Sequence, residues 1–80
     1  MTLKQALGNR IDELCKEKGL NISSLSTLCG INRSTVYSIF GEKSKSPEVA
    51  TIKKICDGLE ITLGEFFTAP IFDGLEQEIK

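Results

Sequence analysis

The chain has 80 residues, of which 40% are hydrophobic, and it carries a formal net charge of −1 with no histidine. This length accommodates one domain with one core, and the absence of histidine excludes Ser-His-Asp and Cys-His catalysis. The chain also lacks a long apolar run and an N-terminal signal sequence, so we expect a cytoplasmic protein that does not span a membrane.

The three cysteines, Cys15, Cys29 and Cys56, are odd in number and widely spaced, and no C-x-x-C motif occurs. A zinc site would need a carboxylate as its fourth ligand, which structural sites rarely use. We therefore expect free core thiols, no metal and no cofactor. Without a histidine, a metal cluster or a glycine-rich phosphate loop, an enzyme is the weakest interpretation.

Charge is distributed unevenly along the chain. Residues 1–56 hold nine Lys or Arg and five Asp or Glu, a balance of +4, whereas residues 57–80 hold one lysine and six acids, a balance of −5. The slight negative total therefore hides a basic end and an acidic end. Such polarity can orient a protein on a polyanion.

The first segment predicts one long amphipathic helix that ends at Gly19, with Lys16 and Lys18 in its last turn. Its apolar stripe recurs at helical spacing and consists of Leu3, Leu7, Ile11, Leu14 and Cys15.

Two short helices with the same start signal come next. Asn21 is expected to cap the first, which ends at Gly30, and Asn32 to cap the second, which ends at Gly41. Each start also shows a hydrophobic staple, formed by Leu20 with Leu25 and by Ile31 with Val36. Because only Gly30 and Ile31 separate Cys29 from Asn32, the two helices must turn sharply against each other.

A polar loop over residues 42–47 precedes a fourth helix, with Ser46 as its expected cap and Pro47 in its first turn. The expected buried face of this helix consists of Val49, Ile52, Ile55, Cys56 and Leu59. Thr62 and Glu65 match a capping box for a short fifth helix, with Ile61 and Phe66 as its staple.

Pro70 is expected to end the fifth helix, and no segment alternates at the period of a strand. The fold class is therefore all-α, a compact bundle of about five helices, with the domain over 1–68 and a tail over 69–80. The tail carries Ile71, Phe72, Leu75 and Ile79 at near-helical spacing. It either covers the core within the chain or forms an interface.

Two helices joined by a tight turn containing glycine are a known device for placing the second helix in a DNA major groove. In the segment 33–40, Val36, Ile39 and Phe40 fall on one arc and predict the inward side. The expected base-contacting residues lie on the other side and are Arg33, Ser34, Tyr37 and Ser38. An arginine fork can bind both guanine acceptors, which discriminates against a wrong base by ~1–3 kcal/mol.

Affinity for DNA requires contacts to phosphates. Lys43 and Lys45 follow the recognition segment and are expected to contact the backbone, as are Ser23 and Ser24 at the start of the preceding helix. Structural interpretations of the same residues remain open. Ser34 and Ser38 can belong to a solvated helix face, and Lys43 and Lys45 can be ordinary loop residues. Tyr37 can cover the edge of the core instead of contacting DNA.

The stretch from about Arg10 to Phe67 resembles the lambda-repressor-like, Cro/XRE helix-turn-helix family of transcriptional regulators. The resemblance is carried by LNISSLSTLCGINRSTVYSIFGEKSKSP and TIKKICDGLEITLGEFF. It implies that Arg33, Ser34 and Ser38 read bases with Tyr37 close by, that Lys43 and Lys45 contact phosphates, and that the protein binds palindromic double-stranded DNA as a homodimer.

Three positions depart from the family pattern. At Ile22 many relatives have a glutamine that braces a phosphate contact, and at Glu48 they often have Ser, Thr or a basic residue. At Ser26 the usual residue is alanine, so the hydroxyl needs a partner. These departures concern affinity for DNA more than the fold.

The leading hypothesis is a sequence-specific DNA-binding regulator, a repressor that occludes a promoter. The alternative is an antitoxin or phage accessory protein that acts mainly as a protein-interaction module. In that case the acidic, partly apolar C-terminal segment would engage a protein partner.

Overall fold

The computed structural model describes residues 1–41 and 46–79. Within these ranges the chain forms five α-helices and one 3-10 turn: α1 (Leu3–Lys18), α2 (Ile22–Cys29), α3 (Arg33–Phe40), α4 (Val49–Leu59), α5 (Leu63–Phe67) and η1 (Pro70–Phe72). No strand occurs in these ranges, which confirms the predicted all-α fold. None of the described helices is long and apolar enough to cross a membrane.

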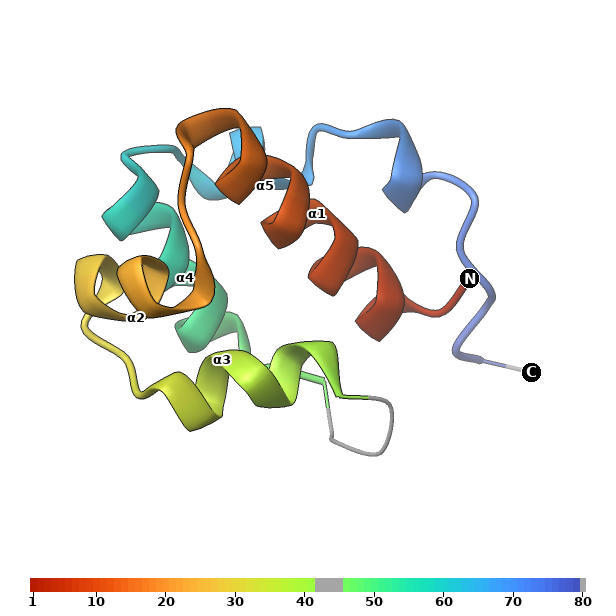
Figure 1. Ribbon diagram of the computed structural model, residues 1–80. Coiled ribbons are helices and arrows are strands. Elements are labelled where there is room, and N and C mark those ends of the chain that lie inside the picture. The colour runs from red at the N-terminus through yellow and green to blue at the C-terminus, as the bar shows by residue number, and fades with distance from the viewer. Residues whose placement is uncertain (42–45, 80) are drawn as a thin grey trace.

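The helices form a bundle in which α2 packs against both α3 and α4, while α1 packs against α3 (Figure 1). The chain beyond α5 returns along α1, so the described part of the tail ends near the N-terminus (Figure 1). There, the backbone N–H of Glu76 donates a hydrogen bond of 3.2 Å to the carbonyl of Met1.

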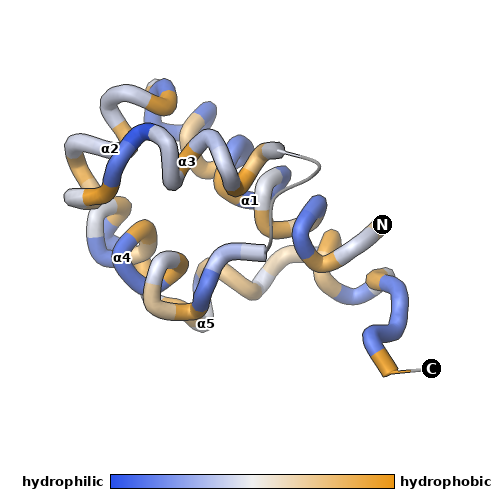
Figure 2. Tube along the Cα trace, turned by 90° about the horizontal axis from the view of Figure 1, so that it is seen from below, coloured by the Kyte–Doolittle hydropathy of each residue, from blue (hydrophilic) through white to orange (hydrophobic). Residues whose placement is uncertain are grey.

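Every α-helix contributes apolar side chains to a single core, because each has one apolar side. Along the tube in Figure 2, hydrophobic and hydrophilic stretches alternate within the helices. The core cluster consists of Leu7, Ile11, Leu14, Cys15, Leu25, Val36, Ile39, Ile52, Ile55, Cys56, Leu59 and Phe66. All three cysteines are free thiols, as predicted.

The helix starts confirm two of the four predicted N-caps. Asn21 and Thr62 each form a complete capping box, in which the side chain accepts from the backbone N–H of Ser24 or Glu65. The prediction for Asn32 is wrong in one respect: it occupies the N-cap position of α3, but its side chain makes no capping hydrogen bond.

The start of α4 also differs from the prediction. Neither Ser46 nor Pro47 begins the helix, because the first helical acceptor is the carbonyl of Glu48, which bonds the N–H groups of Thr51 and Ile52. Val49, predicted to be buried, is 70% exposed. It lies at the first position of α4, one turn before Ile52, which is the first α4 residue to reach the core.

The tail is partly packed and only briefly helical. Residues 70–72 form the 3-10 turn, and no helix continues from 73 to 79. Phe72 packs against the core and its ring centroid lies 6.1 Å from that of Phe66. Further along, Ile79 is 87% exposed. The first half of the tail therefore covers the core within the chain.

Arg10 joins the start of the domain to its end. Its Nε donates to the carbonyl of Phe66 at 2.7 Å and a terminal nitrogen donates to the carbonyl of Glu65 at 2.9 Å. The same guanidinium forms an ion pair with Glu13, and only 13% of the Arg10 side chain is exposed. Arg10 thus binds two carbonyls at the C-terminal end of α5, where only the Glu65 carbonyl also accepts from a backbone N–H, that of Thr68.

Candidate nucleic-acid interface

The turn between α2 and α3 depends on Gly30. This residue has φ +67°, in the left-handed region that favours glycine, and its N–H points at the carbonyls of Ser26 and Thr27. The N–H of Ile31 then bonds the Ser26 carbonyl at 3.1 Å. Asn32 is extended, so α3 starts in a new direction after two residues.

The structure brings the four predicted base-contacting residues together on the outer side of α3. Val36 and Ile39 point inward, with exposures of 0% and 3%. The exposed residues are Arg33, Ser34, Tyr37 and Ser38. The Ser38 hydroxyl donates to the Ser34 carbonyl at 2.9 Å, which leaves its oxygen able to accept.

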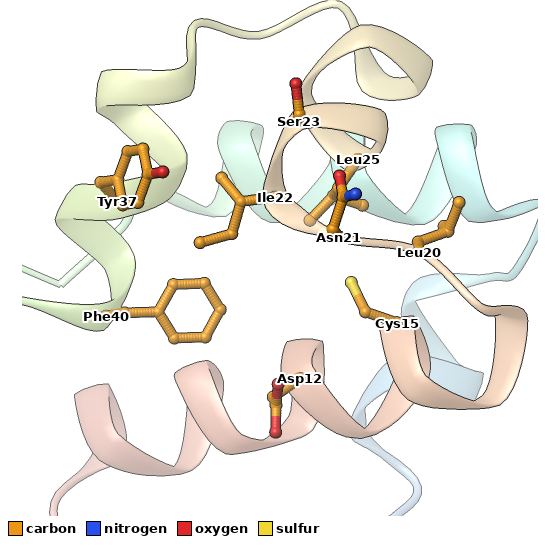
Figure 3. Close-up of a pocket in the computed structure, with 9 residues that line it drawn as sticks. All are labelled: Asp12, Cys15, Leu20, Asn21, Ile22, Ser23, Leu25, Tyr37 and Phe40. Carbon is orange, nitrogen blue, oxygen red and sulfur yellow. The ribbon is translucent and has the colours of Figure 1, made fainter.

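Phe40 does not belong wholly to the inward side, contrary to the prediction. It is 40% exposed and is the last residue of α3. Its ring lies beside a pocket between α1, α2 and α3, across from Ile22 and below Tyr37 (Figure 3). Phe40 therefore lines this pocket, and it is only partly covered although the preceding residue, Ile39, is buried.

This pocket has a volume of about 460 Å³. It is lined by Asp12, Cys15, Leu20, Asn21, Ile22, Ser23, Leu25, Tyr37 and Phe40 (Figure 3). Ile22, which departs from the family's glutamine, points between Tyr37 and Phe40 and is packed against the core. An apolar side chain therefore occupies the position where the family resemblance implies a polar brace.

The start of α2 carries the two serines predicted to contact phosphate, and both are half-buried. Ser24 is engaged within the chain, because its hydroxyl accepts from the N–H of Asn21 and lies 2.8 Å from the Asn21 side-chain oxygen. The carbonyl of Ser23 accepts from the hydroxyls of Ser26 and Thr27. Ser26 thereby finds the partner that its hydroxyl needs, at 2.9 Å.

The remaining predicted phosphate contacts, Lys43 and Lys45, lie outside the described residues, and their role stays a prediction. Glu48, the acidic departure from the family pattern, is exposed at the N-cap of α4 and makes no side-chain capping bond.

Cys15 and Cys56 are buried in the core, and Cys29 is half-buried and packs against it. Burial, more than the neighbouring thiols Cys15 and Cys56, raises the pKa of Cys29 to about 11. Burial also raises the pKa of Cys15 and of Cys56 above the ordinary value. In residues 1–41 and 46–79, no group of three or more His, Cys, Asp or Glu residues is placed to hold a metal ion.

One residue beside the candidate interface is missed by sequence reasoning. The ammonium of Lys4 in α1 donates to the carbonyls of Ser38, Ile39 and Gly41 at the end of α3. These partners lie 34 to 37 residues away along the chain. No local pattern around Lys4 indicates the contact, since it exists only because α1 and α3 are packed together.

A short helix held by an apolar inner side, preceded by a tight glycine turn and a second short helix, defines a helix-turn-helix domain. The chain belongs to the Cro/C1-type helix-turn-helix DNA-binding domain family, whose model matches residues 10–70. This finding confirms the family resemblance predicted from the sequence.

Known relatives agree with this family. The chain is 31% identical over 65 residues to the HTH-type transcriptional regulator PuuR of Escherichia coli (strain K12) and of Shigella flexneri. The match covers 81% of this chain and 35% of those proteins, so the chain spans about a third of their length. Its structure is similar to the crystal structure of the prophage Lp1 protein 11, with a TM-score of 0.81 and 36% identity, covering 88% of this chain and 92% of that one.

Proposed function

We propose that the protein binds specific sequences of double-stranded DNA by inserting α3 into the major groove. The observation that carries the proposal is the two-sided character of α3. Val36 and Ile39 hold it to the core, while Arg33 and Ser34 project outward at its N-terminal end. In this docking geometry the N-terminal residues of the second helix contact base edges.

In this proposal the remaining predicted contacts have distinct roles. Tyr37 and Ser38 extend the base-reading side by one turn, and the start of α2 at Ser23 and Ser24 faces a phosphate. Lys43 and Lys45 neutralise further phosphates. The protein acts as a repressor that occludes a promoter, and two copies bind the half-sites of a palindromic operator.

The proposal is tested by selecting binding sites from a randomised duplex pool. We expect the pool to converge on a symmetric sequence, with half-sites about one helical turn apart. A pool that never converges would contradict specific binding, and an asymmetric site would contradict the homodimer.

Variants then separate base reading from phosphate contact. Arg33→Ala should relax the preference at one base position, which costs about 1–3 kcal/mol of discrimination. Lys43→Ala should instead weaken all sequences alike and reduce the salt slope by about one unit. Lys53→Ala is a matched control because Lys53 is exposed on α4 and pairs with Asp57 there. If Arg33→Ala behaves like this control, Arg33 does not read a base.

A second candidate function rests on the C-terminal segment. Phe67 and Ile79 are 41% and 87% exposed within the acidic part of the chain. We infer that such a surface fits a protein partner, as in an antitoxin or a phage accessory protein, and DNA binding remains compatible with it. This function would be supported if one stoichiometric partner copurifies with the wild-type protein and the Phe67→Ser substitution abolishes the copurification. A protein that purifies alone, with its mass unchanged by that substitution, would contradict it.

A further inference from the structure

The C-terminal end of α3 lacks the left-handed backbone cap that α1, α2 and α4 have. Helices α1, α2 and α4 each end in a left-handed residue, Gly19, Gly30 or Glu60, whose N–H points at two carbonyls of the last turn. At the end of α3, Gly41 is extended, with φ −78° and ψ 135°, and its N–H reaches only the Ser38 carbonyl. The last carbonyls of α3 therefore need donors from elsewhere.

Lys4 supplies these donors. Its Nζ atom lies 3.3 Å from the Ser38 carbonyl oxygen and 3.2 Å from that of Ile39, and it also contacts the carbonyl of Gly41. An ammonium has three N–H donors, and these three acceptors can use all of them. The positive charge also lies at the negative end of the α3 dipole, where it is stabilising.

Gly8, one turn after Lys4, lies against the same end of α3. Gly8 is buried, and a Cβ atom on it would lie 3.5 Å from Phe40 Cδ1 and 3.6 Å from the Ile39 carbonyl oxygen. Residues four apart share one face of a helix. One face of α1 therefore helps to determine where the last turn of α3 lies, through the packing at Gly8 and three hydrogen bonds from Lys4.

We propose that Lys4 is a positioning residue for DNA recognition, which orders the end of α3 and thereby fixes the orientation of its base-reading side. This role rests on the proposed function. Lys4 binds the carbonyl of Ser38, so it acts on the backbone of a residue that faces the base edges. Because its donors are used within the protein, Lys4 does not contact a phosphate. Its loss should therefore weaken specific binding and leave non-specific binding unchanged.

The test compares Lys4→Met, Lys4→Arg and the control Lys53→Met, each of which is measured against the selected operator and against a scrambled duplex. For Lys4→Met we expect about fivefold weaker operator binding, unchanged binding to the scrambled duplex and an unchanged salt slope. Amide hydrogen exchange in the last turn of α3 should accelerate by a similar factor. Lys4→Arg should restore most of the discrimination, and Lys53→Met should leave the exchange unchanged.

The outcomes separate the role of Lys4 from the proposed function. A salt slope reduced by about one unit, with both duplexes weakened alike, would make Lys4 a phosphate contact and overturn the positioning role. Unchanged discrimination in Lys4→Met, with an intact wild-type preference, would overturn that role alone. A wild-type protein that selects no sequence overturns the proposed function, and the DNA role of Lys4 with it. Measurement well below the unfolding midpoint keeps a loss of stability from imitating a loss of binding.

Discussion

In α4, Gly58 faces Cys29 of α2 so closely that a Cβ atom on it would lie 2.4 Å from the Cys29 Sγ atom. The same Cβ would lie 3.0 Å from the Cys29 Cα atom and 3.2 Å from its Cβ atom. Since backbone lies among these neighbours, rotation of one side chain does not relieve the overlap. Gly58→Ala must therefore push α4 and α2 apart, and α2 is the first helix of the helix-turn-helix.

Two opposing effects set the magnitude. Alanine in a helix interior is more stable than glycine by roughly 0.5–1 kcal/mol. Overpacking a core contact destabilises by roughly 1–3 kcal/mol. We expect the second effect to exceed the first, so that the free energy of unfolding falls by about 1–2 kcal/mol. For a domain of this size, each kcal/mol shifts the melting temperature by about 4–8 °C.

Thermal and urea unfolding followed by circular dichroism measure this change. Gly64→Ala in α5 is the matched control, because the nearest atom to its Cβ would be Thr62 Oγ1 at an ordinary 3.7 Å. This control should gain the helix-propensity effect alone. Cys29→Ala should partly relieve the overlap, and a double-mutant cycle gives the coupling energy. A Gly58→Ala variant as stable as the wild type would refute the reasoning, because it would show that overpacking against Cys29 does not exceed the gain in helix propensity.

Three further predictions concern caps, carbonyls and thiols. Asn21→Ala should destabilise the protein by about 1 kcal/mol because it removes a formed cap. In the same urea titration, Asn32→Ala should change the free energy of unfolding by only a few tenths of a kcal/mol, because Asn32 makes no capping bond. Equal losses in the two variants would contradict the assigned caps. Arg10→Met should lower the free energy of unfolding by about 1.5–3 kcal/mol, since two carbonyls lose a charged donor. A melting temperature equal to that of the wild type would show that these bonds contribute nothing to stability. The pKa of Cys29 is about 11 when folded against an ordinary 9.0, so the unfolded chain loses this proton first and stability should fall as pH rises from about 9 to about 11. Cys29→Ala should reduce this fall, and an identical pH profile in that variant would contradict the assignment.

Much of the fold can be predicted from the sequence because its signals are local. A capping box such as Thr62 with Glu65 spans three residues, and a left-handed glycine such as Gly30 acts within one turn. The apolar periodicity of α3 likewise separates the inward Val36 and Ile39 from the outward Arg33 within eight residues. These signals determined the five helices, the turn between α2 and α3, and the side of α3 that carries the candidate site.

Only the tertiary structure decided which distant residues meet. Lys4 reaches the end of α3 and Arg10 reaches Phe66, 56 residues away, because packing of the helices brings these atoms together. Val49 also lies at the first position of α4, before the helix reaches the core, and its own helical period does not reveal that it is exposed. Local chemistry therefore determined each helix and its sides, and the packing of α1 against α3 determined how the end of the recognition helix is held.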